Sequence, residues 1–482
     1  MRMILFLLAT MMFIFLFSPV SGQTDKLIYD QLIRTENPRY YHVPVGLCED
    51  YPEETTTPEI MRKDMEFLKA HNIKLLRISF GWDAIETQKD QYNWLFWDDF
   101  VKMAVEEYGI TLIPYICYTP RWNSTCNTDT LFFWSYPPQD YDHFGTFMKS
   151  LVTRFKPWIK TWELWNEPDI SIYWKGTVED FSRFTKIGAK AVKEADPQAK
   201  VVLAGLAYNT QFTLQLFRDY GVSPYVDIVN MHNYYETWHR YPVENIVGYV
   251  NEMSEIVTLY GNKQSLWMAE VGYSTYRHGS SVSSSYTAFY DYEHTPDYQA
   301  VDLFKRLVLV LSTQKIAAIA WYELKDLPQT EEVIGDEYNN RYLGVAYTDY
   351  KPKPAARALK FFNQLFAQKN KCIDDLITVN RTIGSESEIH AFENEDGSVL
   401  VAGWLKTNLP GKRSTDMSGN VKDTRRESVQ VMIPLKLKGK IVQYNQLGES
   451  IPFKKTEKYS AGIRIPDFIL SGGQITILQL NK

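Results

Sequence analysis

Two glutamates stand at the ends of short apolar runs, where parallel strands present side chains to a site. Glu167 follows the run 161–166, and Glu270 follows the run 265–269. The carboxyl ends of parallel strands in a barrel meet at one face, so two opposite strands can place this pair across one opening. Hydrolysis of a glycosidic bond needs such a pair, one carboxyl group as proton donor and the other as nucleophile or base. The sequence therefore predicts glycosidic chemistry at this face.

The elements that would position the pair alternate along the chain. Apolar runs cover residues 41–48, 75–80, 111–118, 161–166, 200–204, 226–231, 265–269 and 316–322. Amphipathic helical stretches cover 58–70, 96–108, 141–155, 178–195, 214–220, 243–260, 296–312 and 354–366. Eight strands alternating with eight helices indicate parallel βα units, so we predict an α/β fold, a closed (β/α)8 TIM barrel. A doubly wound sheet is the alternative, although no Gly-rich phosphate loop follows the first strand.

The pattern changes after residue 368, where short alternating runs replace the helical periodicity. These runs cover 388–392, 399–406, 428–435, 441–445, 462–465 and 474–480, and Glu395-Asp396-Gly397-Ser398 is typical of a hairpin turn. We therefore predict a smaller antiparallel β-sandwich domain after the barrel. The predicted organisation is a secretory signal peptide in residues 1–22, the barrel catalytic domain in 23–368 and the β-sandwich domain in 369–482.

The N-terminal segment and the composition bear on location and partners. Arg2, an apolar run over 3–17 and small residues before Gln23 are typical of a secretory signal, so we expect a secreted or periplasmic protein. No later stretch is apolar enough to span a bilayer. The formal net charge of -6 over 482 residues disfavours nucleic-acid binding. The sequence gives no indication of oligomeric state.

Cysteine and histidine usage indicates neither a metal nor an organic cofactor. The four cysteines fit no zinc pattern, and the eight histidines include no metal-ligand pair at helical spacing. Export permits disulfides, and Cys117 and Cys126 are the nearest pair, but four free thiols are equally compatible with the sequence. The other two cysteines are Cys48 and Cys372.

Several motifs together resemble those of clan A glycoside hydrolases. Trp165-Asn166-Glu167-Pro168 is similar to the clan's strand-4 signature, and Ala269-Glu270-Val271-Gly272-Tyr273-Ser274 is similar to its strand-7 segment. Tyr92-Asn93-Trp94 with Asp98 and Phe100, together with the trailing β domain, makes the chain most similar to family 39, with family 5 as the near alternative. The resemblance extends from about residue 41 to residue 365.

The resemblance implies a retaining enzyme that cleaves O-glycosidic bonds of a plant or microbial oligo- or polysaccharide through a covalent glycosyl-enzyme. Glu167 would be the general acid/base and Glu270 the nucleophile, with carboxyl groups about 5–5.5 Å apart. Glu167 must then hold a proton, its pKa raised by the Glu270 charge, while Glu270 stays ionised. A carbohydrate-binding barrel without catalysis is the alternative function, because fold alone does not determine activity.

The resemblance also implies residues that bind substrate or support the pair. Arg77 on the second strand would lie near Glu270, and Asn166 would bind the sugar 2-hydroxyl. On the sixth strand, Tyr234 would donate a hydrogen bond to Glu270, and His232 would line the floor of the site. Trp321, at the end of the eighth strand, would stack on the sugar.

Further aromatic residues follow strand ends or occupy the loops after them. Stacking in additional sugar subsites and ordinary packing are both compatible with the sequence for each of them. These residues are Trp82, Trp122, Trp174, Trp238 and Tyr273. The resemblance also has a gap, because family members often have a histidine at the end of the third strand, where this chain has Tyr115 and Tyr118.

Overall fold

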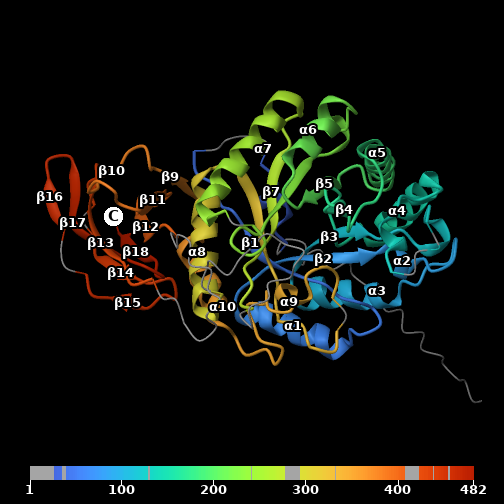
Figure 1. Cartoon of the computed structure of the whole chain (residues 1–482), viewed down its shortest axis with the longest axis horizontal. Helices are drawn as coiled ribbons and strands as arrows, with labels where there is room; N and C mark the ends of the chain where they lie inside the picture. The colour runs from blue at the N-terminus through green and yellow to red at the C-terminus, as the bar shows by residue number, and fades with distance from the viewer. Residues whose placement is uncertain are drawn as a thin grey trace, which may run out of the picture.

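Eight parallel strands form a closed barrel in the computed structural model, in the order β1-β2-β3-β4-β5-β6-β7-β8 (Figure 1). The closed barrel excludes the doubly wound alternative. The strands are β1 (Val45–Glu49), β2 (Leu75–Gly81), β3 (Thr111–Cys117), β4 (Thr161–Asn166), β5 (Lys200–Leu206), β6 (Ile228–Asn233), β7 (Ser265–Val271) and β8 (Ile316–Tyr322). The structure describes residues 27–34, 39–126, 128, 131–239, 241–276, 294–331, 333–407, 423–437, 439–453 and 456–481. The predicted signal peptide, residues 1–22, lies outside them.

Helices surround the barrel and follow the predicted amphipathic stretches closely. They are α1 (Pro58–Ala70), α2 (Trp82–Ile85), α3 (Leu95–Val101), α4 (Tyr141–Phe155), α5 (Val178–Ala195), α6 (Thr210–Arg218), α7 (Ile246–Tyr260), α8 (Pro296–Ser312), α9 (Glu337–Asn340) and α10 (Pro354–Leu365). The predicted helix 96–108 is α3 continued by a π-helical turn, Lys102–Glu107. The predicted helix 214–220 begins earlier, because Asn209 caps α6. None of the helices in the described ranges is long and apolar enough to cross a membrane.

The N-terminal end of the barrel is closed by residues 27–34. The hydroxyl of Tyr29 donates to the Leu112 carbonyl oxygen at 2.7 Å, and Trp267 Nε1 donates to the Leu32 carbonyl oxygen at 2.6 Å. Leu32 has no exposed surface. Since this end is filled, side chains inside the barrel reach solvent at the other end, where the strands terminate.

Two antiparallel sheets follow α10 and form the β-sandwich domain. One has the order β10 (Thr378–Asn380), β13 (Arg426–Ile433), β17 (Gly462–Ser471), β16 (Glu457–Tyr459). The other has the order β15 (Ser450–Ile451), β14 (Ile441–Tyr444), β18 (Thr476–Leu480), β12 (Val399–Leu405), β11 (Ser387–Asn394), β9 (Asn370–Cys372). The predicted turn 395–398 joins β11 to β12, and Gly397 adopts a φ of 80° there. The short strands β9, β10, β15 and β16 were not predicted.

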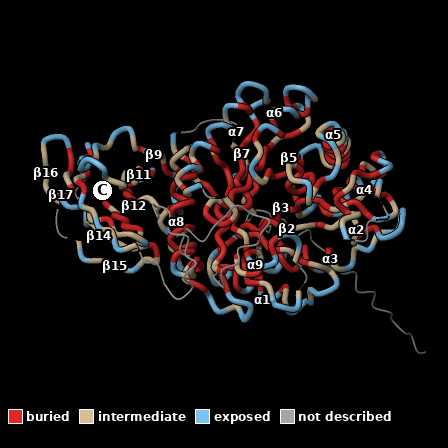
Figure 2. Tube along the Cα trace, viewed as in Figure 1, coloured by how far each residue is buried: buried red, intermediate tan, exposed pale blue. Residues whose placement is uncertain are grey.

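The sandwich packs against α8 and α10 of the barrel (Figure 1). Phe392, Ala402 and Trp404 of the sandwich belong to the same buried apolar cluster as the barrel core. Figure 2 shows buried segments, drawn in red, in both the barrel and the sandwich. Trp404 is fully buried and donates from Nε1 to Glu244 Oε1 at 3.0 Å. The only tryptophan beyond residue 369 is therefore part of the interface between the two domains.

The cysteines form no disulfide. All four, Cys48, Cys117, Cys126 and Cys372, are free thiols in the structure. Cys48 and Cys117 are buried, and burial raises the pKa of both thiols well above the ordinary value. Of the two possibilities that the sequence left open, the structure has the free thiols.

Candidate active site

The end of β4 has an unusual backbone that directs the proposed acid into the barrel. Trp165 adopts a φ of 86° and Glu167 a φ of 44°, values that side-chain-bearing residues seldom adopt. Packing offsets the strain, because the Trp165 ring is fully buried and its Nε1 donates to the Tyr173 carbonyl oxygen at 3.0 Å. Glu167 N donates to the Gly205 carbonyl oxygen on β5 at 2.9 Å. Contacts of the Trp165 side chain and of the Glu167 backbone together therefore fix the backbone conformation at the end of β4.

Arg77 on β2 joins the ends of β4 and β7. Its Nη1 donates to Glu270 Oε2 at 2.7 Å, and its Nη2 donates to Asn166 Oδ1 at 2.8 Å. Its Nε and Nη2 also donate to the two carboxylate oxygens of Glu163, at 2.9 and 3.0 Å. Burial alone would lower the pKa of the guanidinium, but the Glu163 and Glu270 carboxylates more than offset this, so its pKa lies well above the ordinary value. Arg77 is therefore a fixed buried cation.

Glu270 at the end of β7 is bound through both oxygens. While Arg77 holds Oε2, the hydroxyl of Tyr234 donates to Oε1 at 2.8 Å. Gly272 permits this approach, because a Cβ there would lie 2.7 Å from Tyr234 Cε1. Burial raises the pKa of Glu270 to about 7, while Arg77 and the Tyr234 hydrogen bond act to lower it. These two contacts favour the ionised form.

Glu167 is hydrogen-bonded to His232 and lies close to Glu270. His232 Nδ1 is 2.8 Å from Glu167 Oε1, and burial lowers the pKa of the imidazole well below its ordinary value, so the ring is neutral. Burial, and then the Glu270 charge, raise the pKa of Glu167 well above its ordinary value. One oxygen of Glu167 and one of Glu270 lie within 4.8 Å of each other. Of the two carboxyl groups, Glu167 has the surroundings that more strongly favour the protonated form.

Both carboxyl groups remain accessible to a small extent. Glu167 is 7% exposed and Glu270 is 8% exposed, whereas His232 and Arg77 have almost no exposed surface. Asn166 and Tyr234 are each 5% exposed. The structure thus brings together six of the residues singled out in the sequence. They are Arg77, Asn166, Glu167, His232, Tyr234 and Glu270.

Three of the aromatic residues predicted to bind sugar have side chains that are buried in packing contacts. Trp82 begins α2, has no exposed surface and packs on Phe144 and Phe147 of α4. Trp174 is 3% exposed and donates from Nε1 to the Thr177 carbonyl oxygen. Tyr273 is fully buried and stacks on His294, with ring centroids 5.0 Å apart.

The other three aromatic residues differ in burial, and a sugar-binding role for any of the six stays a prediction. Trp122 and Trp238 are half-buried. Trp122 Nε1 donates to the Glu86 carbonyl oxygen at 2.8 Å, and the Trp238 ring centroid lies 4.3 Å from that of Tyr234. Trp321 pairs with Val271, the residue after Glu270, but its ring is fully buried, and its Nε1 has no hydrogen-bond partner among the described residues.

Two further residues complete the site, and the sequence reasoning did not single out the first of them, Glu163. Glu163 lies in the middle of β4 and is 1% exposed. A charged residue inside an apolar strand signals a buried partner, since an unpaired buried charge is very costly. Asp50 follows β1 and accepts hydrogen bonds from the hydroxyls of Tyr115 and Tyr322, at 2.7 and 3.1 Å. Tyr115 in turn lies under the guanidinium of Arg77, which is 4.1 Å from its ring centroid.

Two groups of side chains in the described ranges have metal-ligand spacing. One is Glu167, His232 and Glu270, the reacting groups themselves. The other is Glu86, Asp90 and His143, in which Glu86 Oε1 already accepts from the Asp90 backbone N and lies 2.7 Å from His143 Nε2. A hydrogen bond joins His232 to Glu167 in the first group, and another joins His143 to Glu86 in the second.

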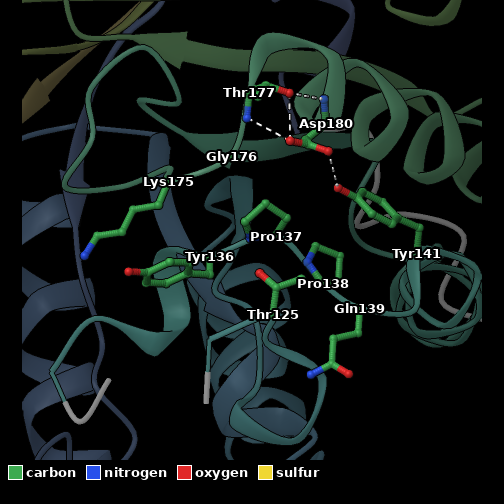
Figure 3. Close-up of a pocket in the computed structure, with 10 residues that line it drawn as sticks. All are labelled: Thr125, Tyr136, Pro137, Pro138, Gln139, Tyr141, Lys175, Gly176, Thr177 and Asp180. Carbon is green, nitrogen blue, oxygen red and sulfur yellow. Dashed lines mark hydrogen bonds between the residues drawn. The ribbon is translucent and has the colours of Figure 1, made fainter. Parts of the chain in front are cut away.

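A pocket of about 380 Å³ lies between the loops that follow β3 and β4 (Figure 3). Thr177 and Asp180 form the capping box of α5 on one wall, and Tyr141 donates to the same Asp180. The pocket contains none of the predicted site residues. Its lining residues are Thr125, Tyr136, Pro137, Pro138, Gln139, Tyr141, Lys175, Gly176, Thr177 and Asp180.

A closed barrel with one carboxyl group after β4 and another at the end of β7 is the arrangement of a glycosidase that works with two carboxyl groups. The chain belongs to the glycosyl hydrolases family 39, whose family model matches residues 41–433. The match runs past α10 into the β-sandwich. It confirms the predicted family and the predicted class of enzyme, an O-glycosyl hydrolase.

The individual proteins that the chain resembles share little sequence identity with it. A β-xylosidase of Caldicellulosiruptor saccharolyticus is 28% identical over 110 residues, which make up 20% of this chain and only 22% of that protein. A family 39 glycoside hydrolase from Bacteroides cellulosilyticus WH2 has a TM-score of 0.63 at 15% identity, covering 94% of this chain and 82% of the other. A monomeric β-xylosidase from Caulobacter crescentus CB15 has a TM-score of 0.62 at 15% identity, covering 91% and 96%. The structural likenesses confirm the fold.

Proposed function

We propose that the protein is a retaining glycosidase in which Glu167 is the general acid/base and Glu270 is the nucleophile. The observation that carries this proposal is the pair itself, in which one oxygen of Glu167 lies within 4.8 Å of one oxygen of Glu270. Inverting enzymes hold their carboxyl groups about 6.5–9.5 Å apart to accommodate a water molecule, whereas retaining enzymes hold them about 5–5.5 Å apart. The short spacing supports double displacement.

The different environments of the two carboxyl groups assign their roles. Glu270, held by Arg77 and Tyr234, attacks the anomeric carbon, and protonated Glu167 donates its proton to the leaving oxygen. Ester formation removes the Glu270 charge, so the pKa of Glu167 falls. Glu167 then takes a proton from the water molecule that hydrolyses the glycosyl-enzyme. Asn166, oriented by Arg77, binds the sugar 2-hydroxyl.

The substrate is a glycoside of an oligo- or polysaccharide, and β-xylosides are the first candidates. The supporting observation is the partial sequence match to a β-xylosidase. A panel of aryl glycosides and plant and microbial polysaccharides, with product analysis, identifies the sugar. Binding without turnover across the panel would instead favour a carbohydrate-binding barrel.

Two variants test the catalytic roles. Glu270→Ala should abolish turnover, because no nucleophile replaces the carboxylate. Glu167→Ala should lower kcat/KM far more for glycosides with poor leaving groups than for those with activated aryl leaving groups, because only poor leaving groups need a proton. Wild-type-like turnover by folded Glu270→Ala would refute the assignment. The anomeric configuration of the first product, followed by NMR, tests retention.

We also propose that the protein is exported and that residues 1–22 are removed. The support is the positive start, the apolar run and the small residues before Gln23. N-terminal sequencing of the protein recovered outside the cytoplasm should begin at Gln23. Recovery of the uncleaved chain from the cytoplasm alone would contradict the proposal.

A further inference from the structure

Glu163 on β4 has no part in the bond-breaking steps above, yet it is among the most heavily hydrogen-bonded side chains in the barrel. Its Oε2 accepts from Arg77 Nε at 2.9 Å. Its Oε1 accepts from Arg77 Nη2 at 3.0 Å, from Gly205 N at 2.8 Å and from Asn230 Nδ2 at 2.9 Å. All four contacts come from N–H donors, so both oxygens of Glu163 act as hydrogen-bond acceptors.

The single cation of Arg77 is therefore shared by two buried anions. Glu163 accepts hydrogen bonds from Nε and Nη2 of the guanidinium, and Glu270 accepts one from Nη1. The two-point Glu163 pair fixes the plane of the guanidinium, which leaves Nη1 aimed at Glu270 and Nη2 at Asn166. The two residues that Arg77 orients are the proposed nucleophile and the ligand of the 2-hydroxyl.

We propose that Glu163 is a positioning residue that acts through Arg77, fixing the guanidinium for Glu270 and Asn166 and sharing its charge so that the Glu270 carboxylate remains reactive. This inference rests on the proposed function. A nucleophile paired with an unshared arginine would be a weaker base, and therefore less reactive, than one whose partner cation is also neutralised by a second carboxylate.

The ionisation of Glu270 is the property that should respond to Glu163. Glu163 is one of the charges that raise the pKa of Glu270, after burial, and Arg77 and Tyr234 oppose it. Charged or titratable groups that interact with Glu270 come from four strands and the loops that follow them. These are Cys48 and Asp50 from β1 and its loop, Arg77 from β2, Glu163 and Glu167 from β4 and its loop, and His232 and Tyr234 from β6.

Glu163→Gln is the decisive variant, because it removes the charge and keeps the shape. The amide oxygen can still accept from Gly205 N, Asn230 Nδ2 and Arg77 Nη2, but the amide nitrogen that replaces Oε2 cannot accept from Arg77 Nε. Arg77 therefore keeps one contact to this side chain, and its charge is committed to Glu270. The acidic limb of the kcat/KM profile, which reports Glu270 ionisation in the free enzyme, should move to lower pH by about one unit. The same variant should lower kcat at least tenfold.

Two matched variants separate charge from structure. Glu163→Asp keeps the charge but shortens the reach to Arg77, so kcat should fall while the acidic limb stays nearer that of the wild type. Asp302→Asn breaks another buried two-point pair, in which Arg306 Nε and Nη2 donate to Asp302 at 3.0 and 2.9 Å on α8. It should lower the melting temperature without moving the limb.

Glu270 ionisation is also measured without turnover, by the carboxyl ¹³C resonance that disappears in Glu270→Gln. The titration midpoint should fall in Glu163→Gln even if the chain hydrolysed no panel substrate, in which case only the proposed function would fail. An unmoved or raised midpoint in folded Glu163→Gln would overturn the inference. If that variant does not fold, Glu163→Asp decides: a tenfold loss of kcat at an unchanged melting temperature supports the inference, and a kcat within twofold of wild type overturns it.

Discussion

Gly205 on β5 is the position where adding one methyl group should damage the proposed acid most selectively. A Cβ at this residue would lie 2.0 Å from His232 Nε2. Since comfortable non-bonded contacts between heavy atoms are about 3.5–4.0 Å, the ring would have to retreat by roughly 1.5 Å. The retreat is blocked, because Nδ1 of the same ring already lies 2.8 Å from Glu167 Oε1. Either the His232 ring turns away or Glu167 is displaced.

The expected cost follows from these contacts. Overpacking of a buried site destabilises a protein by about 1–3 kcal/mol. Loss of a hydrogen bond to an ionisable group costs about 1.5–3 kcal/mol, which corresponds to roughly 10–100-fold in rate if it is felt in the transition state. Gly205→Ala should therefore fold less stably and lose about that factor in kcat/KM on substrates with poor leaving groups. Substrates with activated leaving groups should lose much less in the glycosylation step.

The assay compares an alkyl and an activated aryl glycoside of the same sugar, with thermal melting to check folding. Gly248→Ala is the matched control, because Gly248 lies in α7 and a Cβ there would meet no atom within 4 Å. That variant should gain about 0.5–1 kcal/mol of stability and keep wild-type kinetics. Gly205→Ala with unchanged kcat/KM on both substrates, or with equal losses on both, would refute the link from Gly205 through His232 to the acid.

Three other changes test separate parts of the structure. Tyr234→Phe removes a 2.8 Å hydrogen bond to Glu270 and should move the acidic limb of the kcat/KM profile to higher pH by about 1–2 units. This shift is opposite in direction to the one expected for Glu163→Gln. An acidic limb that stays in place would contradict the role of Tyr234 in stabilising the Glu270 carboxylate. Trp404→Ala should lower the free energy of unfolding by about 3–5 kcal/mol. The barrel and the sandwich should still unfold in one melting transition, and two separate transitions would show that the domains unfold independently. Burial raises the pKa of both Glu49 and Glu236 to about 8, so the stability that their protonated forms contribute below about pH 4.5 should be lost as the pH rises towards 8. The melting temperature should therefore fall over this range, and Glu236→Gln should make the fall smaller. A melting temperature that rises with pH would contradict these pKa shifts.

Much of this site could be predicted because strand ends and carboxyl groups are both visible in a sequence. Glu167 and Glu270 follow apolar runs, and the parallel barrel brings their ends together whatever the loops do. Glu163 was not predicted, because its partner Arg77 is 86 residues away and only barrel closure reveals their contact. The role of Gly205 depends on which ring lies opposite it, and that also needs the fold.

Position along the chain does not determine the direction in which an aromatic side chain points. Trp82 does follow a strand, but it begins a short helix and faces α4 rather than the opening. The left-handed backbone at Trp165 interrupts the alternation of β4, so that the Trp165 ring packs on Trp174 and Phe184 while Asn166 binds Arg77 inside the barrel. Alternation along a strand fixes a side only while the strand is regular.

The charges inside the barrel explain how one acid can serve twice in the proposed reaction. Before attack, Arg77 faces the carboxylates of Glu163 and Glu270, and the surplus negative charge keeps the proton on Glu167. Formation of the ester on Glu270 leaves one cation and one anion, so the charge that raised the pKa of Glu167 is gone and its proton is released more readily. Without Glu163, Arg77 and Glu270 would already balance before attack, and the proton on Glu167 would be held less firmly when the leaving group needs it. The buried carboxylate in the middle of β4 therefore sets the charge from which both half-reactions start.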